Sequence, residues 1–197
     1  MRSRPTASAW RRSDAGALSS AFRADPALAV QVGGADLSTT DAAAAYLAST
    51  LADPDAAPPE DGTDRAPQRP SALPRTRSWA IDDDGLAVGS VTLSAIESRH
   101  GTAWASYWVA PSARGRGLAA SALAAVSAWA FDAGLFRLEL GHRVNNPASC
   151  RVAGRAGYLV EGIERGKLRY GAERFDVELH ARLATDPDAT VRALHLV

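Results

Sequence analysis

The stretch SARGRGLAASALAA at residues 112–125 alternates two arginines with two glycines before a run of small apolar residues. Gly115 and Gly117 let the chain turn tightly and let a ligand approach the backbone, and the first N–H groups of a helix that follows lack internal partners. These amides and the helix dipole favour phosphate. Arg114 and Arg116 add charge-assisted hydrogen bonds of about 1.5–3 kcal/mol each from the rim. The stretch therefore predicts a phosphate-binding turn.

Other interpretations of this turn differ in the context that they need. A P-loop requires a lysine followed by serine or threonine, which the stretch lacks, so nucleoside triphosphate chemistry is not expected. The spacing Gly115-x-Gly117-x-x-Ala120 fits the dinucleotide-binding pattern, which needs a parallel sheet and an acidic ribose contact, for which Glu139 is the candidate. A solvated strand-to-helix turn, whose glycines only relieve backbone strain, also remains open.

Length and composition limit the class of protein. The 197 residues fit one domain with a single site, and the 22 basic and 22 acidic residues give no net field that would attract nucleic acid or an anionic membrane. No window approaches the roughly 18 apolar residues of a membrane span, and the N-terminus lacks the apolar run of a signal peptide. Cys150 is the single cysteine, so we expect no disulfide, no cysteine-rich zinc site and no other metal site. These features predict a soluble cytoplasmic protein.

The elements that must position the turn are predicted from periodicity and turn residues. Apolar residues at helical spacing predict one helix after Ser13 and another after residues 38–40. Residues 53–76 contain six of the eleven prolines, which excludes a helix or central strand there and predicts a flexible loop. From Ser78 on, three short runs separated by turn residues predict an antiparallel meander: SWAID, LAVGSVTL and TAWASYWVAP.

The phosphate-binding turn follows this meander and begins a helix with one apolar face. Residues 135–142 alternate as a strand, so the turn lies in a strand–helix–strand unit. Asn146 can cap a short helix with Pro147 at its first position. The runs YLVEGIERGKLRY and FDVELHARL then predict a final hairpin around Gly171.

This order of elements predicts an α+β fold. We expect a single domain over residues 1–197, with a mixed, mostly antiparallel twisted sheet of about six to seven strands and about four helices. The core is expected at about residues 6–185, followed by a tail at residues 186–197. Exposed sheet edges and alanine-rich helices are compatible with a homodimer.

Several segments resemble the GNAT superfamily of N-acetyltransferases and stand in the same order as in that family. Arg114-x-x-Gly117-x-Ala119 is similar to the family's pyrophosphate loop, whose pattern is Gln/Arg-x-x-Gly-x-Gly/Ala. The resemblance runs from about Trp79 to Leu183. The other segments look like the RimJ/RimL-like branch of ribosomal-protein N-terminal acetyltransferases; they are Tyr107–Pro111, Phe131-Asp132, Asn146-x-x-Ser149, and Ala156-Gly157-Tyr158 through Glu161-Gly162.

The resemblance implies that acetyl-CoA, or another acyl-CoA, is the cosubstrate and that a primary amine accepts the acetyl group. The cofactor's pyrophosphate would lie on the amides of residues 115–119, at the positive end of the helix that follows. The cofactor-binding residues that the resemblance implies are Val109, Arg114, Gly115, Arg116, Gly117, Leu118, Ala119, Asn146 and Ser149.

In this family the amine attacks the thioester directly. Holding the two reactants in line can supply roughly 7–11 kcal/mol, so no enzyme nucleophile is required. Cys150 is therefore expected to be buried packing. By resemblance, Ser149 is the candidate that protonates the departing CoA thiolate, and Asn146 binds the pantetheine arm. The alternative that Asn146 and Ser149 only begin a helix remains open.

The base that takes the proton from the attacking ammonium is less evident. Many relatives carry a glutamate three residues before the Tyr-Trp pair, and Trp104 stands there in this chain, with Ser106 in place of the usual glycine. Each remaining candidate also fits surface charge, a hairpin pair or a structural role. The candidates that could act through water are Glu97, Glu178 and Asp176, with His142 as a further one.

The pKa of the acceptor limits which amine can react without a strong base. Freeing an α-amine of pKa near 7.8 at neutral pH costs about 1 kcal/mol, whereas a lysine side chain of pKa near 10.4 costs about 4.6 kcal/mol. We therefore expect an N-acetyltransferase that acts on a protein or peptide N-terminus or on a similarly acidic small-molecule amine. The alternatives are a non-catalytic acyl-CoA-binding module and an NAD(P)-dependent oxidoreductase.

Overall fold

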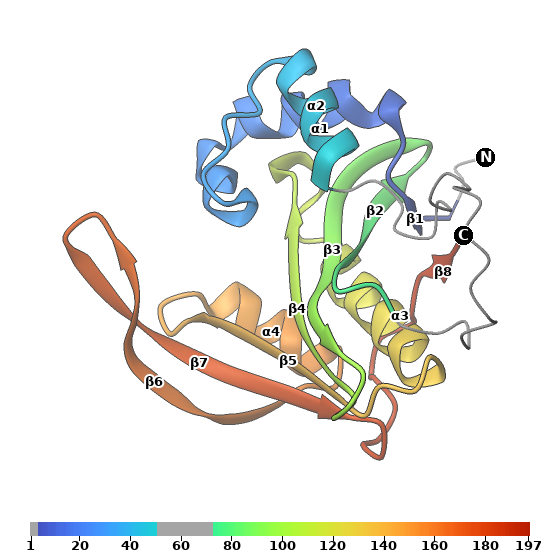
Figure 1. The fold of residues 1–197 in the computed structure, drawn as a ribbon, viewed down its shortest axis with the longest axis vertical. Coiled ribbons are helices and arrows are strands. Elements are labelled where there is room, and N and C mark those ends of the chain that lie inside the picture. Colours follow the sequence, from blue (N-terminus) through green and yellow to red (C-terminus); the bar gives the residue numbers. More distant parts are fainter. Residues whose placement is uncertain (1–3, 51–72) are drawn as a thin grey trace, which may run out of the picture.

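The computed structural model describes residues 4–50 and 73–197. Within these residues the elements follow the predicted order of helices, meander, crossover helix and hairpin (Figure 1). The α-helices of this part of the chain are α1 (Ala15–Ala24), α2 (Thr40–Thr50), α3 (Leu118–Asp132) and α4 (Pro147–Arg155). Its strands are β1 (Thr6–Ala9), β2 (Arg77–Asp83), β3 (Leu86–Glu97), β4 (Thr102–Val109), β5 (Arg137–Arg143), β6 (Leu159–Tyr170), β7 (Glu173–Leu183) and β8 (His195–Leu196). None of the described helices is long and apolar enough to cross a membrane.

All these strands join one sheet in the order β6-β7-β5-β4-β3-β2-β1-β8. The pairs β4–β5 and β1–β8 are parallel and the other pairs are antiparallel, which confirms the predicted mixed, mostly antiparallel sheet. The sheet has eight strands, more than predicted, because β1 and β8 have only 4 and 2 residues and are too short to show a clear alternation. The tail prediction is wrong at His195–Leu196, which pairs with β1.

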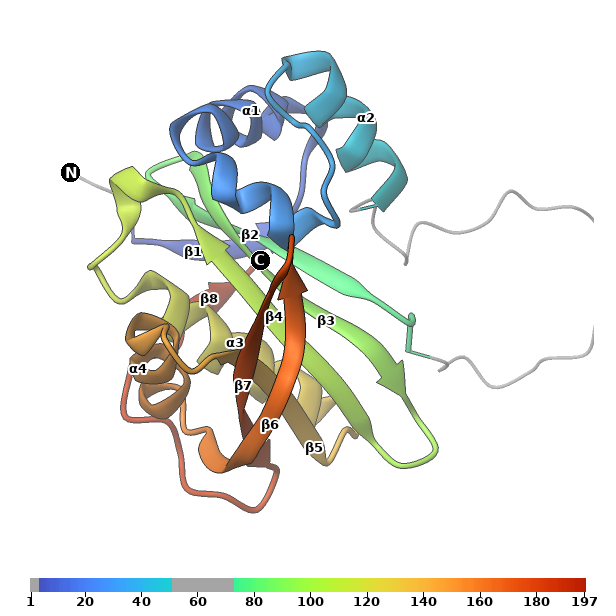
Figure 2. The same ribbon diagram turned by 90° about the vertical axis from the view of Figure 1, so that its left-hand side faces the viewer.

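Helices cover both faces of the sheet, as Figures 1 and 2 show. Alternate residues of a strand point to opposite faces, so each face has its own apolar cluster. Trp79 and Ile81 of β2 pack with α3 and α4, whereas Ala80 between them packs with α1 and α2. The sheet therefore separates two cores, and a cavity that crosses the sheet would reach both layers.

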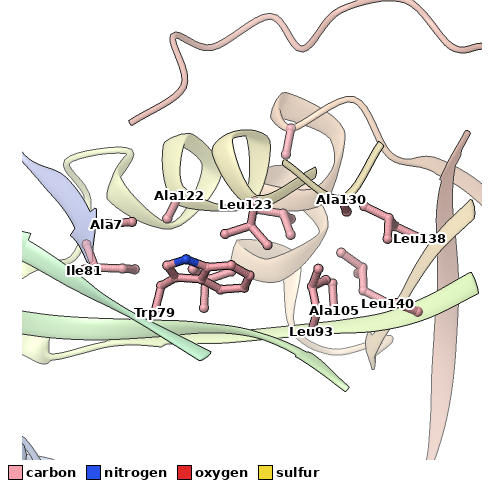
Figure 3. Packing of buried hydrophobic residues seen from close by; sticks show 14 of the residues in the cluster. Ala7, Trp79, Ile81, Leu93, Ala105, Ala122, Leu123, Ala130, Leu138 and Leu140 are labelled. Atoms are coloured by element: carbon pink, nitrogen blue, oxygen red, sulfur yellow. The ribbon is translucent and has the colours of Figure 1, made fainter. Parts of the chain in front are cut away.

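The core beneath α3 fixes the helix that the glycine–arginine turn begins. Figure 3 shows Ala122 and Leu123 of α3 over the sheet residues Trp79, Leu93 and Ala105. Leu123 is fully buried, as is Leu93, and burying a leucine side chain stabilises the fold by about 1.5–3 kcal/mol. The start of α3 therefore has a fixed position relative to β4.

The strands β4 and β5 pair only at one end. Thr102 to Trp104 pair with Arg137 to Glu139, and beyond these three residue pairs the two strands run apart (Figure 1). β4 continues to Val109 against β3, while β5 continues to Arg143 against β7. Within residues 4–50 and 73–197, the β5 side of β4 therefore has no strand partner from Ala105 onward.

The predicted hairpin around Gly171 and the predicted Asn146 cap are confirmed. Gly171 has φ +61° in the turn between β6 and β7, and Asn146 caps α4 with Pro147 at the first helical position. Most of the predicted loop at residues 53–76 lies outside the described residues, which resume at residue 73.

Candidate functional site

A cavity of about 850 Å³ opens where β4 and β5 separate. Its walls come from β4, β5, the turn before α3, the first turns of α3 and α4, β6, and the 3₁₀ helix η2 (Pro26–Val32). Ligand pockets of proteins commonly have volumes of about 300–1,000 Å³. The cavity therefore has room for an extended small-molecule ligand, and it joins the sequence-predicted turn to the sequence-predicted Asn146–Ser149 segment.

The turn before α3 presents bare backbone at one end of this cavity. Gly115 has φ +76° and Gly117 has φ +79°, a left-handed conformation that glycine adopts without strain. Gly117 is the N-cap of α3 and has no side chain to cap the first amides of the helix. These N–H groups have no intrahelical acceptor, so a ligand at this end of the cavity can accept from them.

The two arginines of the turn are held in ion pairs. The Arg114 guanidinium donates to Asp25 and, through Nε, to the Val109 carbonyl at 2.9 Å. Arg116 donates to both carboxylate oxygens of Asp83, and this pair raises the pKa of the Arg116 guanidinium. Both charges are therefore already compensated by carboxylates within the protein.

A third cation near the turn was not predicted. Arg155, the last residue of α4, has its guanidinium nitrogens 3.8 and 3.9 Å from where a Cβ would stand at Gly117. Sequence reasoning missed Arg155 because it lies 38 residues from Gly117 in a different helix, and nothing in the spacing of the two indicates contact.

Asn146 and Ser149 line the cavity and hold each other in place. The Asn146 Oδ1 accepts from the Ser149 N–H at 3.3 Å, and the Asn146 Nδ2 donates to the Ser149 Oγ at 3.0 Å. Because the Ser149 oxygen accepts that bond, its own O–H proton is free to point elsewhere, and it has no acceptor among the described residues. Tyr107 supports the same turn by donating to the Ser149 carbonyl at 3.3 Å, and burial raises the pKa of Tyr107 to about 12.

The structure does not bring Glu97 or Asp176 to the cavity. The Glu97 carboxylate accepts from the Arg99 and His100 amides at 2.7 and 2.8 Å, and these bonds lower the pKa of Glu97. Asp176 accepts from the Gly166 amide at 2.7 Å in the β6–β7 hairpin. Both carboxylates therefore stabilise turns, because they accept hydrogen bonds from backbone amides that a short connection between strands leaves without partners.

Glu178 lies behind the cavity wall. It pairs in register with His142, whose side chain lines the cavity, and its Oε1 is 2.9 Å from the His180 Nε2. Desolvation opposes its ionisation, yet hydrogen bonds from His180 and Cys150 lower the pKa of the carboxyl. Cys150 is partly exposed, and the bond to Glu178 and burial raise the pKa of its thiol. The prediction that Cys150 is buried apolar packing is therefore wrong.

Trp104 forms an aromatic wall at the position for which the family resemblance implies a glutamate. A Cβ at Gly141 would stand 3.2 and 3.3 Å from the Trp104 indole carbons and 2.8 Å from the Val177 Cγ1, so only glycine lets this ring lie against β5. The Lys167 Nζ lies 5.4 Å from the centroid of the Trp104 ring. Sequence analysis identified Trp104 as a departure from its relatives but did not predict this contact with Gly141.

The rest of this wall combines one cation with aromatic groups. The Arg143 guanidinium lies 5.3 Å from the centroid of the Tyr170 ring, and both residues line the cavity together with Trp104. A separate hollow of about 30 Å³, lined by Tyr46, Ser106 and Trp108 among others, lies on the side of α1 and α2. A hollow of this size holds about one water molecule.

Comparison with known families and proteins identifies relatives. The family model described as acetyltransferase (GNAT) domain matches residues 4–159. A ribosomal-protein-serine acetyltransferase of Escherichia coli is 31% identical over 108 residues, which are 54% of this chain. The match spans 60% of the length of that relative.

Solved structures share the fold over most of the chain. A RimL ribosomal α-N-protein acetyltransferase in complex with coenzyme A has a TM-score of 0.69 at 18% identity and covers 91% of this chain and 93% of its own. A self-immunity acetyltransferase for microcin, MccE, in complex with acetyl-CoA and AMP has a TM-score of 0.72 at 15% identity, covering 91% and 92%. A chimera of the Vibrio cholerae spermidine N-acetyltransferase SpeG reaches 0.70 at 18% identity, covering 93% and 97%.

Proposed function

Because the chain belongs to the GNAT acetyltransferase family, we propose that it is an N-acetyltransferase that uses acetyl-CoA and a primary amine. The observation that carries the proposal is the separation of β4 and β5 after Trp104, which opens a cavity bounded by the glycine turn at one end and by Ser149 at its side. When bound there, acetyl-CoA supplies the activated acyl group.

The pyrophosphate of the cosubstrate fits the end of the cavity at residues 115–119. The amides of this turn and the positive end of the 15-residue α3 attract an anion, and the nearby Arg155 adds a cation. Arg114 and Arg116 support the turn through Asp25 and Asp83, so their expected contribution to binding is indirect.

The pantetheine arm fits the unpaired side of β4. Peptide groups on the β5 side of this strand have no partner strand from Ala105 to Val109, and amide groups of a ligand can pair with them as an added strand would. Val109 at the end of β4 and Asn146 at the start of α4 line this path.

Ser149 is the proposed proton donor to the leaving thiolate. The nitrogen lone pair of the amine forms the new bond to the acyl carbon, the carbon–sulfur bond breaks, and the sulfur takes the Ser149 hydroxyl proton. The nitrogen loses its extra proton to water as the amide forms, and water returns a proton to the Ser149 oxygen. Asn146 fixes the Ser149 oxygen at 3.0 Å, so the hydroxyl is preorganised for this transfer. Water takes the proton that the ammonium loses before attack, since Trp104 offers no basic group.

The acceptor that fits best is an α-amine of a peptide or a comparable small-molecule amine. The wall formed by Trp104 and Tyr170 is aromatic, and Arg143 adds positive charge to it, whereas the nearby Lys167 is paired with Glu164. The Arg143 charge disfavours a polycationic acceptor such as spermidine. A neutral or acidic peptide N-terminus, which needs only about 1 kcal/mol for deprotonation at neutral pH, fits this wall and needs no strong base.

Thermal unfolding with added ligands tests the cosubstrate. Acetyl-CoA and free CoA, each at about 100 times the dissociation constant, should raise Tm by about 5–10 °C, whereas NADH and NADPH should not. A shift with the nicotinamides alone would favour the dinucleotide interpretation of the turn and contradict the proposal.

Turnover with a set of acceptors tests the reaction. CoA release should be seen with peptides that have a free α-amine, and not with the same peptides blocked at the N-terminus and carrying an internal lysine, nor with spermidine. Preference for lysine or spermidine would overturn the proposed acceptor. Binding of acetyl-CoA without turnover of any amine would instead identify a non-catalytic acyl-CoA-binding module.

A homodimer in a reducing compartment completes the proposal. The edge strand β6 exposes Leu159, Val160 and Ile163, whose exposed fractions are 62%, 57% and 56%. An apolar edge strand of this kind pairs readily with a second copy. Light scattering should give the mass of a dimer, and Ile163→Glu should convert it to a monomer; a monomeric native chain would contradict the dimer.

The compartment is proposed from the single cysteine. Cys150 forms no disulfide, which fits a reducing cytoplasm.

A further inference from the structure

Four side chains with metal-binding atoms converge at the cavity wall that His142 lines. His142 comes from β5, Glu178 and His180 come from β7, and Cys150 comes from α4. One ligand atom from each of these residues lies within 4.8 Å of all the others. The register pairs His142 with Glu178 and Leu140 with His180, so both histidines and the carboxylate lie on the face that α4 covers.

The distances between these atoms suit a small ion. The two Nε2 atoms of His142 and His180 are 3.0 Å apart. The Glu178 Oε1 lies 2.9 Å from the His180 Nε2 and 3.4 Å from the His142 Nε2. Nitrogen ligands of a tetrahedral zinc ion, at about 2.0–2.1 Å from the metal, stand about 3.3 Å apart. The two imidazoles and the carboxylate therefore stand near this spacing, whereas the widest separation in the four-residue cluster, up to 4.8 Å, must shrink by about 1 Å to surround zinc.

The tautomer of His142 also fits a metal ligand. Its Nδ1 lies 3.0 Å from the Arg143 carbonyl oxygen, which can only accept, so Nδ1 carries the proton and Nε2 presents a lone pair to the cluster. Metal-binding histidines are commonly oriented by such a bond from their second nitrogen. His180 lacks such an orienting bond, because its Nδ1 is buried without a hydrogen-bond partner among the described residues.

Burial and charge favour a divalent cation of intermediate softness. His142 is 7% exposed and His180 is 2% exposed, while Cys150 and Glu178 are partly exposed and leave a path for an ion to enter. A thiolate and a carboxylate together neutralise two positive charges. Thiolate and imidazole ligands select zinc over magnesium or calcium. Arg182, on the same face of β7, donates instead to the Ala156 carbonyl at 3.1 Å.

We propose that His142, Cys150, Glu178 and His180 bind one zinc ion, which fixes α4 against β5 and β7. Four protein ligands would close the coordination sphere, so the ion is structural and leaves the acetyl transfer to the cavity. Cys150 directly follows Ser149, so the ion would also position the turn of α4 that carries the proposed proton donor. The binding of zinc does not depend on the proposed function, although His142 also lines the cavity and Cys150 adjoins Ser149.

Cobalt titration of the chelator-treated, dialysed protein tests the proposal. Because Cys150 is the single cysteine, a thiolate-to-cobalt charge-transfer band can come only from this site. We expect one cobalt ion per chain, the visible bands of tetrahedral cobalt, and loss of both when one equivalent of zinc is added. Zinc at about 100 times its dissociation constant should raise Tm by about 5–10 °C.

Variants separate the site from adventitious binding. Cys150→Ser should abolish the charge-transfer band, and His180→Asn should weaken cobalt binding at least tenfold. His100→Gln, an exposed histidine in the β3–β4 turn, is the matched control and should bind as the native chain does. Circular dichroism and the Tm shift with acetyl-CoA show whether each variant is folded. Absence of the band in the folded native chain, with no response of Tm to zinc, would make the four side chains a hydrogen-bonded cluster only and overturn the proposal.

Discussion

The two ends of the large cavity differ in the groups that form them: backbone amides at one end and side chains at the other. At the α3 end, Gly115 and Gly117 expose backbone amides, and the surrounding side chains hold the turn without covering it. At the opposite wall, Trp104, Arg143 and Tyr170 come from three strands and present side chains. A backbone-built end binds a constant chemical group, whereas a side-chain wall can vary with the acceptor. If the two ends bind cosubstrate and acceptor as proposed, recognition of each can change without the other.

The largest expected effect comes from closing the backbone-built end. Gly117→Val places a branched side chain at φ +79° and distorts the first amides of α3, so the Kd for acetyl-CoA should rise about 1,000-fold, as expected for two lost charge-assisted hydrogen bonds. Calorimetric titration measures it. Gly85→Val is the matched control, because Gly85 has φ +83° in the β2–β3 turn and lines no part of the cavity. Equal losses in both variants would mean that general strain, and not the turn, weakens binding.

Removing the proposed proton donor should have the next largest effect. Ser149→Ala should lower kcat about 100-fold, at the low end for general acid catalysis because a thiolate is already a good leaving group. The Kd for acetyl-CoA should change little, since the amides at residues 115–119 remain. Steady-state kinetics with Ser149→Thr as the hydroxyl-retaining control check this. An unchanged kcat in Ser149→Ala would remove Ser149 from the mechanism.

A change in the side-chain wall should affect the acceptor alone. Gly141→Ala places a Cβ 2.8 Å from the Val177 Cγ1 and against the Trp104 indole, which must move. Overpacking of this kind costs about 1–3 kcal/mol of unfolding free energy. KM for the amine should rise about tenfold while the Kd for acetyl-CoA stays constant, as measured by kinetics and titration. Weaker binding of acetyl-CoA in this variant would show that the two ends of the cavity are coupled.

The smallest effect is expected at the rim of the turn. Arg116→Ala should change the Kd for acetyl-CoA less than about threefold, because Asp83 already compensates the Arg116 charge. Arg99→Ala, in the exposed β3–β4 turn, controls for the loss of one positive charge. A tenfold higher Kd in Arg116→Ala, with no change in Arg99→Ala, would mean that Arg116 contacts the phosphate directly.

Local signals in the sequence predicted much of the fold and one end of the site. Alternation predicted the meander, and the glycines with the following apolar face predicted the turn and α3. The strands β1 and β8 were too short to be recognised. The glycine turn was predictable because a left-handed backbone and a helix start are properties of neighbouring residues.

Contacts between distant segments were not predictable. Asp25 and Asp83, which hold the turn's arginines, lie 89 and 33 residues from their partners. The sequence named His142, Cys150 and Glu178 separately and for different reasons, and the expectation of no metal site considered cysteine-rich motifs alone. The alternation Glu178-x-His180 on one strand was a signal that both side chains share a face, but only the register with β5 brings them to His142.

The short pairing between β4 and β5 predicts where the sheet deforms most easily. In the part of the chain that the structure describes, three strand residue pairs at Thr102–Trp104 join β6, β7 and β5 to the other strands. A ligand bound between the two parts of the sheet would restrict their relative motion. Amide hydrogens on the open side of β4 should therefore exchange with solvent faster in the free protein than in the liganded one, and part of the binding free energy would go into this ordering.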